Sequence, residues 1–336
     1  MKTKKAGHWP RFSSPLPKEV TDRFLMGYAP HFVEHPISRQ VQGALIDMLA
    51  LPVSQLLSII SQVEQPLATR IAAGEVLGLK GDPRIDPFNP HMLTVPGGTV
   101  QIGLAPERVD PVMSAFEGLG LDRSWIEKET PCHRVALDEY RIARYPVTNS
   151  EYRHFLLETQ HPALASSWAF GAYPHHMANH PVYSVDASDA DAYACWLSKR
   201  TGRLFALPSE AQWEHAAAGS QRLQFPWGEH FEATFANTAE LGLMQTTPVG
   251  VFIEGASPFG VMDMAGNVEE YVAQAYHPYP GGPQIRDDLV LDVGEHRVAR
   301  GGSFTRFRDL ARTARRHGRY PRPLYVMGFR LVENLR

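Results

Sequence analysis

Glycine and proline are concentrated after residue 80, where they interrupt almost every apolar stretch of the chain. Because these residues favour turns and end helices and strands, long regular elements are not expected there. Of the 336 residues, 27 are glycine and 27 are proline, yet 43% are hydrophobic. That apolar content is typical of a globular protein and excludes disorder, collagen and coiled coil. We therefore expect a folded, loop-rich domain in the later part of the chain.

Residues 37 to about 80 have instead the periodicity of amphipathic helices. Pro52 and Pro66 stand where a first helical position is expected, and Gly81 stands as a stop. The segment therefore predicts three short helices with tight connections. The apolar positions that recur at three- and four-residue intervals are Ile37, Val41, Leu45, Met48, Leu49, Val53, Leu56, Leu57, Ile60 and Val63.

Residues 70–84 resemble one degenerate helical repeat of the HEAT kind, in which Ala73, Gly74 and Gly78 allow close packing. A single repeat cannot bury its own core, so a helical cap packed on the next domain is expected rather than a separate binding module. The chain then divides into an N-terminal extension over residues 1–36, a helical HEAT-like segment over 37–84, and a second domain over 91–336.

The pattern changes after Pro90. Residues 92–103 predict two short strands about a Pro-Gly-Gly turn, and residues 134–144 alternate well enough to predict a third strand. Three helices then begin at capping boxes. Beyond residue 220 we find no helical periodicity, so the expected fold class is α+β with much irregular chain. The paired capping positions are Thr148 with Glu151, Ser188 with Asp191, and Ser209 with Gln212.

Charge and cysteine content narrow the class of partner and the compartment. The 33 Lys and Arg against 36 Asp and Glu give a net charge of -3, so we expect neither a nucleic-acid nor a membrane partner. We find no secretory signal and no run of roughly 18 apolar residues that could span a membrane. Only Cys132 and Cys195 are present. We expect both to be ordinary buried residues of a cytoplasmic protein, although a bridge between them stays open.

Seven short blocks follow one another along the second domain. They are 94–99 (TVPGGT), 145–149 (YPVTN), 207–214 (LPSEAQWE), 226–228 (PWG), 266–268 (GNV), 300–304 (RGGSF) and 328–331 (GFRL). In this order they resemble the sulfatase-modifying-factor family over about residues 91 to 335. That family includes the formylglycine-generating enzymes, the catalytic domains of ergothioneine-type sulfoxide synthases, a pyoverdine-maturation oxidase, and the variable proteins of diversity-generating retroelements.

The resemblance implies a compact, loop-rich domain of the C-type-lectin-like fold, with its N-terminal and C-terminal strands paired. It does not give the chemistry, because one fold hosts unrelated functions. In the formylglycine-generating enzymes a cysteine pair shortly after the Gly-Gly-Ser block binds copper. Residues 302–310 here read GSFTRFRDL and contain no cysteine. Without a thiolate pair to hold Cu(I), the chain is not expected to be a formylglycine-generating oxidase.

The resemblance also implies a structural calcium site. Asp263, Gly266, Val268 and Glu270 match positions where the formylglycine-generating enzymes bind calcium through side-chain and backbone oxygens, the hard ligands that Ca²⁺ prefers. The alternative is a loop held by hydrogen bonds without metal. Residues 237 and 238, Asn and Thr, resemble part of a second calcium site, but no acidic partner follows at the right place.

A cluster of three histidines, His175, His176 and His180, is a weak candidate metal site. In a helix His176 and His180 would share one face, as metal ligands can. Pro174 and Pro181 favour a loop instead, with histidines on the surface or in caps. The iron-using members of the resembled family take their histidines from a separate four-helix domain. Iron and copper therefore stay candidate cofactors without a visible ligand set.

The sharpest charge asymmetry lies in residues 300–330, which contain nine arginines against Asp309 as the only acid. In the resembled family this segment forms the floor of the ligand pocket, and guanidinium groups beside aromatic rings suit an anionic or aromatic ligand. The alternative is that most of these arginines are structural or solvated. If Arg306 lies on the pocket floor, Arg306→Ala should change stability by less than about 1 kcal/mol. The candidate pocket residues are Ser303, Arg306, Phe307, Arg308, His317, Tyr320 and Tyr325.

Two main functions are compatible with these features. One is an oxygen-using oxidoreductase, metal-assisted or not, that acts on a peptide or an amino-acid-derived substrate and does not make formylglycine. The other is a C-type-lectin-like ligand-binding protein, for example a retroelement-diversified one with variable residues in 305–326. Three runs there, 305–310, 317–320 and 322–326, lack Lys, Glu, Gln, Met and Trp, which mutagenised AAY codons cannot encode. A scaffold that has lost activity is the third. The sequence leaves open whether the chain is an enzyme, and its partner is expected to be a small molecule or peptide, with an anionic ligand as one candidate.

Overall fold

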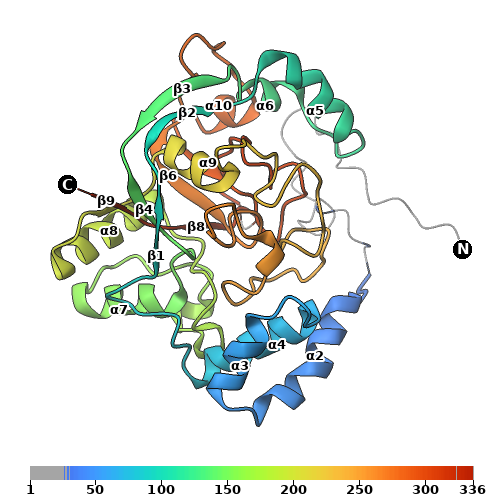
Figure 1. The fold of residues 1–336 in the computed structure, drawn as a ribbon, viewed down its shortest axis with the longest axis vertical. Coiled ribbons are helices and arrows are strands. Elements are labelled where there is room, and N and C mark those ends of the chain that lie inside the picture. The colour runs from blue at the N-terminus through green and yellow to red at the C-terminus, as the bar shows by residue number, and fades with distance from the viewer. Residues whose placement is uncertain (1–25, 27–28, 30, 323, 336) are drawn as a thin grey trace, which may run out of the picture.

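The computed structural model describes residues 26, 29, 31–322 and 324–335. Figure 1 shows helices α2 to α4 below a larger body in which short strands and helices are joined by long loops. Most of the expected N-terminal extension lies outside the described residues. Within the part of the chain that is described, no helix is both long and apolar enough to cross a membrane.

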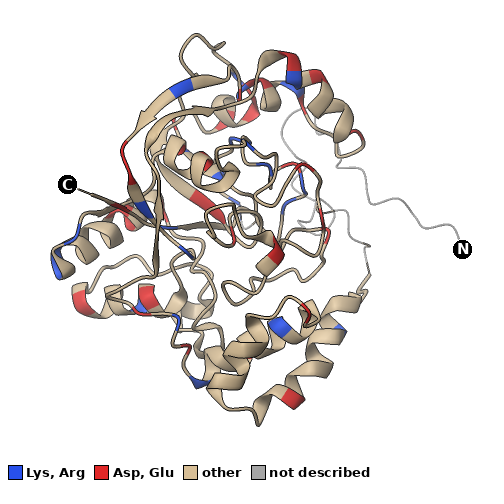
Figure 2. Ribbon diagram, in the orientation of Figure 1, with Lys and Arg blue, Asp and Glu red and all other residues tan. Residues whose placement is uncertain are grey.

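The three helices expected before residue 81 are present. They are α2 (Pro36–Leu49), α3 (Val53–Ile60) and α4 (Leu67–Lys80). Figure 2 shows that these helices carry few charged residues, as their apolar periodicity requires. Their own core is small, because few elements share it. It is built from Met48, Leu56, Ile60, Ala72, Ala73, Val76 and Leu77.

Helix α4 packs directly on the second domain. A Cβ added at Gly74 would lie 2.7 Å from Pro248 Cβ, and one at Gly78 would lie 2.6 Å from Asn179 Oδ1. The Asn179 amide donates to the carbonyl of Gly74 at 3.0 Å, and Arg70 pairs with Glu254 at 2.7 Å. The small residues therefore let α4 approach the domain closely, and the helical segment acts as a cap on it.

The second domain contains three small open sheets. The first has the order β1–β4–β9–β5, the second pairs β2 with β3, and the third has the order β7–β6–β8. All neighbours are antiparallel except β6 and β8, which run parallel. The bounds are β1 (Met92–Val95), β2 (Gly98–Ile102), β3 (His133–Leu137), β4 (Tyr140–Ala143), β5 (Phe205–Ala206), β6 (Glu269–Ala275), β7 (Arg297–Arg300), β8 (Met327–Phe329) and β9 (Val332–Asn334).

Helices cover both faces of the β7–β6–β8 sheet. On one face Tyr271, Ala299 and Met327 join the core that contains residues of α7 and α8. On the other face Val272 and Val298 pack with Trp213 of α9. These apolar layers hold the sheet in place. The helix bounds are α5 (Val109–Ala115), α6 (Arg123–Glu127), α7 (Asn149–Thr159), α8 (Ala187–Thr201), α9 (Glu210–Ala218) and α10 (Asp288–Asp292), with 3₁₀ turns η1 (Pro106–Arg108), η2 (Ala169–Gly171), η3 (His175–Met177) and η4 (Ile253–Gly255).

The mixed α+β fold is confirmed, with local corrections. The N-terminal and C-terminal strands β1 and β9 share a sheet, but β4 lies between them. The single strand expected over 134–144 is two strands, because residues 138 and 139 break the pairing. Helix α8 begins at a capping box of Asp186 and Asp189, two residues before the expected one. The short helix α10 is capped by Asp287, and it is too short to show a periodicity.

Candidate functional site

The centre of the site is Glu269, the first residue of β6. Its partner across the parallel pair is Met327, and its own exposed fraction is 0%. Tyr271 pairs with Ala299, and Ala299 forms a bridge to His317 on the next segment. Paired residues project from the same face of a sheet, and so do residues two apart on one strand. Glu269, Tyr271, Ala299 and His317 therefore share one face of the sheet.

Two side chains hold the carboxylate of Glu269 in this buried position. Arg306 donates from Nε to Oε1 at 2.9 Å, and His317 Nδ1 lies 2.5 Å from Oε2. Burial alone would raise the pKa of Glu269, but His317 and Arg306 together lower it to about 2. Glu269 is therefore an ionised carboxylate at neutral pH and can only accept hydrogen bonds.

The geometry fixes the tautomer of His317. Because Glu269 can only accept, Nδ1 of His317 must carry the proton of the short contact. Burial lowers the pKa of His317 below its usual value, so the ring is neutral at pH 7. In a neutral imidazole with a proton on Nδ1, the Nε2 atom holds a free lone pair. Nε2 of His317 is thus a basic nitrogen, while the buried carboxylate of Glu269 holds the ring through Nδ1.

Two tyrosines complete what we call the Glu269 cluster: Glu269, Arg306, His317, Tyr320 and Tyr325. The Tyr325 ring stacks on His317 with centroids 5.5 Å apart and an interplanar angle of 19°. The Arg306 guanidinium lies 3.9 Å from the centroid of Tyr325, a cation–π contact. Tyr320 packs on Tyr325 at 5.4 Å and donates to Asp292 at 3.2 Å. Both tyrosines and His317 are partly exposed, so the cluster opens to the surface.

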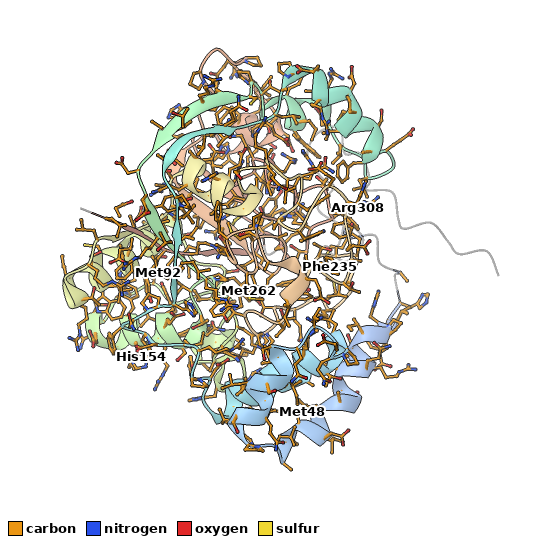
Figure 3. All side chains as sticks on the ribbon, in the orientation of Figure 1. Met48, Met92, His154, Phe235, Met262 and Arg308 are labelled. Carbon is orange, nitrogen blue, oxygen red and sulfur yellow. The ribbon has the colours of Figure 1, made fainter. Side chains whose placement is uncertain are left out.

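The cluster contains four of the seven candidate pocket residues, Arg306, His317, Tyr320 and Tyr325. The other three lie elsewhere. Ser303 is fully buried and its hydroxyl contacts that of Thr305, and Phe307 packs in a separate apolar core. Arg308 pairs with Glu240 at 3.3 Å (Figure 3). The expectation that Arg306→Ala is a mild surface change is wrong, because Arg306 is 3% exposed and ion-paired.

Most of the remaining arginines of residues 300–330 are structural. Arg316 binds both carboxylate oxygens of Glu210, at 2.7 and 2.9 Å. Arg312 binds both oxygens of Glu129, at 2.5 and 2.9 Å. Arg300 pairs with Glu214 and Glu210, and it too is buried. These ion pairs explain the charge asymmetry, because the acids that balance the arginines come from other parts of the chain.

The residues expected to bind calcium have well-defined contacts. Arg330 donates to both oxygens of Glu270 at 2.6 Å, and Trp213 donates to Oε2 at 2.7 Å. Asp263 accepts from the backbone of Gly250 at 2.7 Å through Oδ2, while its Oδ1 is buried without a hydrogen-bond partner. Burial raises the pKa of Asp263 to about 6. Further buried oxygens without a partner are Oδ1 of Asn237, Oγ1 of Thr238 and Oγ1 of Thr247.

The three histidines do not form a metal site. His175 and His176 are exposed, whereas His180 is buried between Thr246 and Glu75, at 3.0 and 3.2 Å. Over residues 31–322 and 324–335 no group of three or more His, Cys, Asp or Glu could hold a metal ion. The cysteines also differ from expectation. Both are free, Cys195 is exposed and Cys132 is partly exposed, since neither points into an apolar core.

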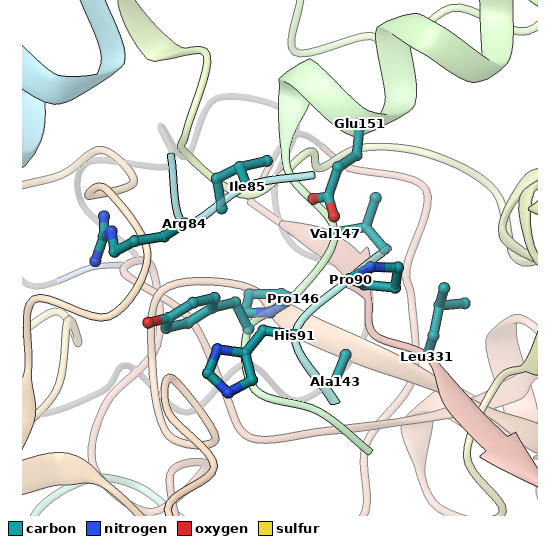
Figure 4. A pocket seen from close by; sticks show the side chains of 10 residues that line it. Arg84, Ile85, Pro90, His91, Ala143, Pro146, Val147, Glu151 and Leu331 are labelled. Carbon is teal, nitrogen blue, oxygen red and sulfur yellow. The ribbon is translucent and has the colours of Figure 1, made fainter. Parts of the chain in front are cut away.

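A small pocket lies where the segment after α4 meets the start of α7. Figure 4 shows the carboxylate of Glu151 pointing into it, with Arg84 and His91 at its sides. Burial raises the pKa of Glu151 to about 7, against two hydrogen bonds that Thr148 donates to its Oε2. The bond from the Thr148 backbone, together with the one that the Glu151 backbone donates to Thr148 Oγ1 at 3.4 Å, forms the capping box of α7. The carboxylate therefore has a structural role in starting the helix.

Sequence reasoning missed Glu269 and favoured its neighbour Glu270. The two carboxylates project from opposite faces of β6, Glu270 toward Trp213 and Arg330 and Glu269 toward His317. Residues 269–272 are all buried, and acidic residues at buried positions need cationic partners. The partners themselves, 37 and 48 residues away, could not be identified from spacing.

Comparisons with known proteins agree with the fold. The family described as sulfatase-modifying factor enzyme 1-like domain matches residues 80–335. A hercynine oxygenase of Mycolicibacterium thermoresistibile is 30% identical over 234 residues, which are 58% of this chain and 51% of that protein. The bovine formylglycine-generating enzyme is 26% identical over 267 residues, 63% of this chain and 68% of that enzyme. The chain spans about half the length of the hercynine oxygenases that it matches.

Solved structures show the same architecture. PvdO from Pseudomonas aeruginosa superposes with a TM-score of 0.55 and 26% identity, over 73% of this chain and 95% of that one. Treponema denticola variable protein 1 superposes with a TM-score of 0.50 over 72% of this chain and 94% of that one. Its identity is 18%, so that similarity concerns the fold alone. The resemblance seen in the seven sequence blocks is confirmed.

Proposed function

This chain belongs to the sulfatase-modifying factor enzyme 1-like domain family, and we propose that it is an oxidoreductase of that family which uses His317 as its base. The hercynine oxygenases and PvdO among the similar proteins support an oxidase-like role. The observation that carries the proposal is the Glu269–His317 pair, because the contact of Nδ1 with Glu269 leaves Nε2 of the neutral, partly exposed imidazole able to accept a proton. The proposed substrate is a peptide or an amino-acid-derived molecule.

The cluster supports proton transfer coupled to substrate oxidation. When an HX–YH group is oxidised to X=Y, the substrate loses two electrons and two protons, and dioxygen takes them up to form hydrogen peroxide. Nε2 of His317 accepts one of these protons as it leaves the substrate, and the ionised Glu269 stabilises the imidazolium that forms. Arg306 keeps Glu269 ionised and in place, so it is a positioning residue. Residues 302–310 contain no cysteine, so formylglycine formation by a copper thiolate pair is not proposed.

The described residues do not supply a redox-metal site at the cluster. Nε2 of His317 could ligate a metal, yet no set of three His, Cys, Asp or Glu side chains surrounds it within residues 31–322 and 324–335. We therefore derive no step through iron or copper. Turnover assays with and without added metal decide whether one is required.

The ligand-binding alternative is supported less well. A diversified protein must vary its binding residues without unfolding. Within 305–310, the first of the three runs, every residue except Arg308 is buried, and Thr305 and Arg306 make internal hydrogen bonds. Substitution there would disturb the core. A near-repeat of the 3′ coding sequence beside a reverse transcriptase gene would support that alternative instead.

Turnover tests the proposal directly. A panel of amino acids, N-acetylated amino acids and short peptides is incubated with the protein in air, and oxygen uptake and product masses are measured. We expect His317→Gln to reduce kcat about 10²- to 10⁴-fold, the usual contribution of a positioned base. The exposed His175→Gln is the control and should keep the wild-type rate. Wild-type kcat should fall in acid, because protonated Nε2 cannot accept a proton. Full activity of His317→Gln would contradict the proposal.

We also propose a structural calcium ion near Asp263. Asp263 Oδ1 is buried and has no hydrogen-bond partner in the described part of the chain. The same holds for side-chain oxygens of Asn237, Thr238 and Thr247. Buried oxygens without hydrogen-bond donors suit a hard cation such as Ca²⁺. Glu270 is less suited, since Arg330 neutralises it.

Thermal melting tests whether a calcium ion binds the folded protein. An ion that binds only the folded state stabilises it, by about 2.7 kcal/mol at 100 times its dissociation constant. We expect wild type to melt several degrees higher in calcium than in chelator, and Asp263→Asn to lose that difference. Magnesium should not replace calcium, because it demands a tighter octahedral site. Equal melting temperatures of the wild type in calcium and in chelator would show that there is no such ion.

A further inference from the structure

Arg319 differs in exposure from six other arginines of residues 300–330. Arg300, Arg306, Arg312, Arg315, Arg316 and Arg330 are each 3% exposed or less. Arg319 is 34% exposed, and it pairs with Asp186, whose carboxylate is 64% exposed. An ion pair this exposed to water contributes little to stability, so the guanidinium can exchange its partner at little cost.

Arg319 also lies on the same face of the sheet as the proposed base. It follows His317 by two residues, and Gly318 between them faces the other way, toward His296. Glu269 contacts His317, and Tyr271, two residues further along β6, contacts Arg319. Strand β6 thus holds Arg319 and His317 side by side, two residues apart along their own segment, a backbone spacing of roughly 6.6 Å if that segment is extended.

We propose that Arg319 binds the carboxylate of the substrate, which displaces Asp186, and that the reacting group of the substrate then lies at His317. This deepens the proposed function and rests on it. The guanidinium fork matches a carboxylate and forms two charge-assisted hydrogen bonds. A carboxylate close to the reacting group is a feature of amino acids and of peptide C-termini. In the free protein Asp186 keeps the guanidinium of Arg319 in position, and it competes with the substrate carboxylate for that guanidinium.

The probes are N-acetylglycine, which resembles a peptide C-terminus, glycine, which resembles a free amino acid, and N-acetylglycinamide, which lacks the carboxylate. Binding to the full chain is measured by NMR titration. We expect at least one carboxylate to bind and the amide to bind at least about tenfold more weakly. Arg319→Gln should weaken carboxylate binding about tenfold or more. Arg308→Gln is the matched control, with a side chain 29% exposed, and should change nothing.

The second variant is expected to have the opposite effect on the affinity for the carboxylate. Asp186→Asn removes the competing charge while asparagine still caps α8, so carboxylate binding should become severalfold tighter. Unchanged affinity in Arg319→Gln, weaker binding in Asp186→Asn, or equal binding of acid and amide would each overturn the assignment. His317→Gln should bind the carboxylate normally while losing turnover. If it binds normally and also retains turnover, the base is wrong but the Arg319 subsite stands.

Discussion

Replacing Arg306 with alanine is expected to lower the free energy of unfolding by about 3 to 5 kcal/mol at pH 8, the usual effect of leaving one member of a buried ion pair alone. Glu269 is fully buried, and the variant removes the one arginine that is bonded to it within the described residues. The result would be read from urea denaturation. The control Arg308→Ala removes a partly exposed ion pair with Glu240 and should change the free energy of unfolding by less than about 1 kcal/mol.

The same variant should be less destabilised in acid. Arg306 holds the pKa of His317 down, so its removal raises that pKa. The folded variant therefore binds a proton at His317 at a higher pH than the folded wild type does, so lowering the pH stabilises the variant relative to the wild type. At pH 5 a protonated His317 therefore replaces the lost positive charge beside Glu269. A loss under 1 kcal/mol at pH 8, or a larger loss at pH 5, would contradict this account of the cluster.

Glu270→Ala is expected to cost about 3 to 5 kcal/mol for a different reason. It leaves the guanidinium of Arg330, which is 0% exposed, without its carboxylate, although the carbonyls of Ala143 and Met262 still accept from it. Glu270→Gln should cost less, because the amide oxygen can still accept one hydrogen bond. Both are measured by urea denaturation.

Stability measured in chelator distinguishes the pairing of Glu270 with Arg330 from a role of Glu270 as a calcium ligand. If Glu270 acts by pairing with Arg330, the loss in Glu270→Ala is the same with calcium or with chelator. If Glu270 acts only as a calcium ligand, wild type and variant would have equal stability in chelator. That equality would show that the Arg330 pair contributes nothing.

The sequence predicted what depends on local pattern. Periodicity placed the three helices before residue 81, and the capping boxes at Thr148 and Ser209 placed the starts of α7 and α9. The ordered blocks indicated the family, which the match over residues 80–335 confirms. These signals are contained in a few neighbouring residues, so they can be read without knowing the fold.

The partners of the charged residues could not be predicted in this way. Arg306 was expected on a pocket floor, because spacing does not show that Glu269, 37 residues earlier, lies beneath it. His180 was grouped with its sequence neighbours, whereas its partner Glu75 is on α4, 105 residues away. A buried ion pair is a property of two distant segments, and only the packing of α4 and of β6 brought these segments together.

The protonation of His317 is the most direct measurement of the central claim. In ¹⁵N-labelled protein the imidazole nitrogens of His317 are identified by comparison with His317→Gln, and their shifts are followed from pH 5 to 8. We expect a neutral ring at pH 7 with the proton on Nδ1, a free Nε2, and a pKa below the usual value of about 6.5. A proton on Nε2 of a neutral ring, or an imidazolium at pH 7, would contradict the claim that Glu269 and Arg306 hold His317 as a base.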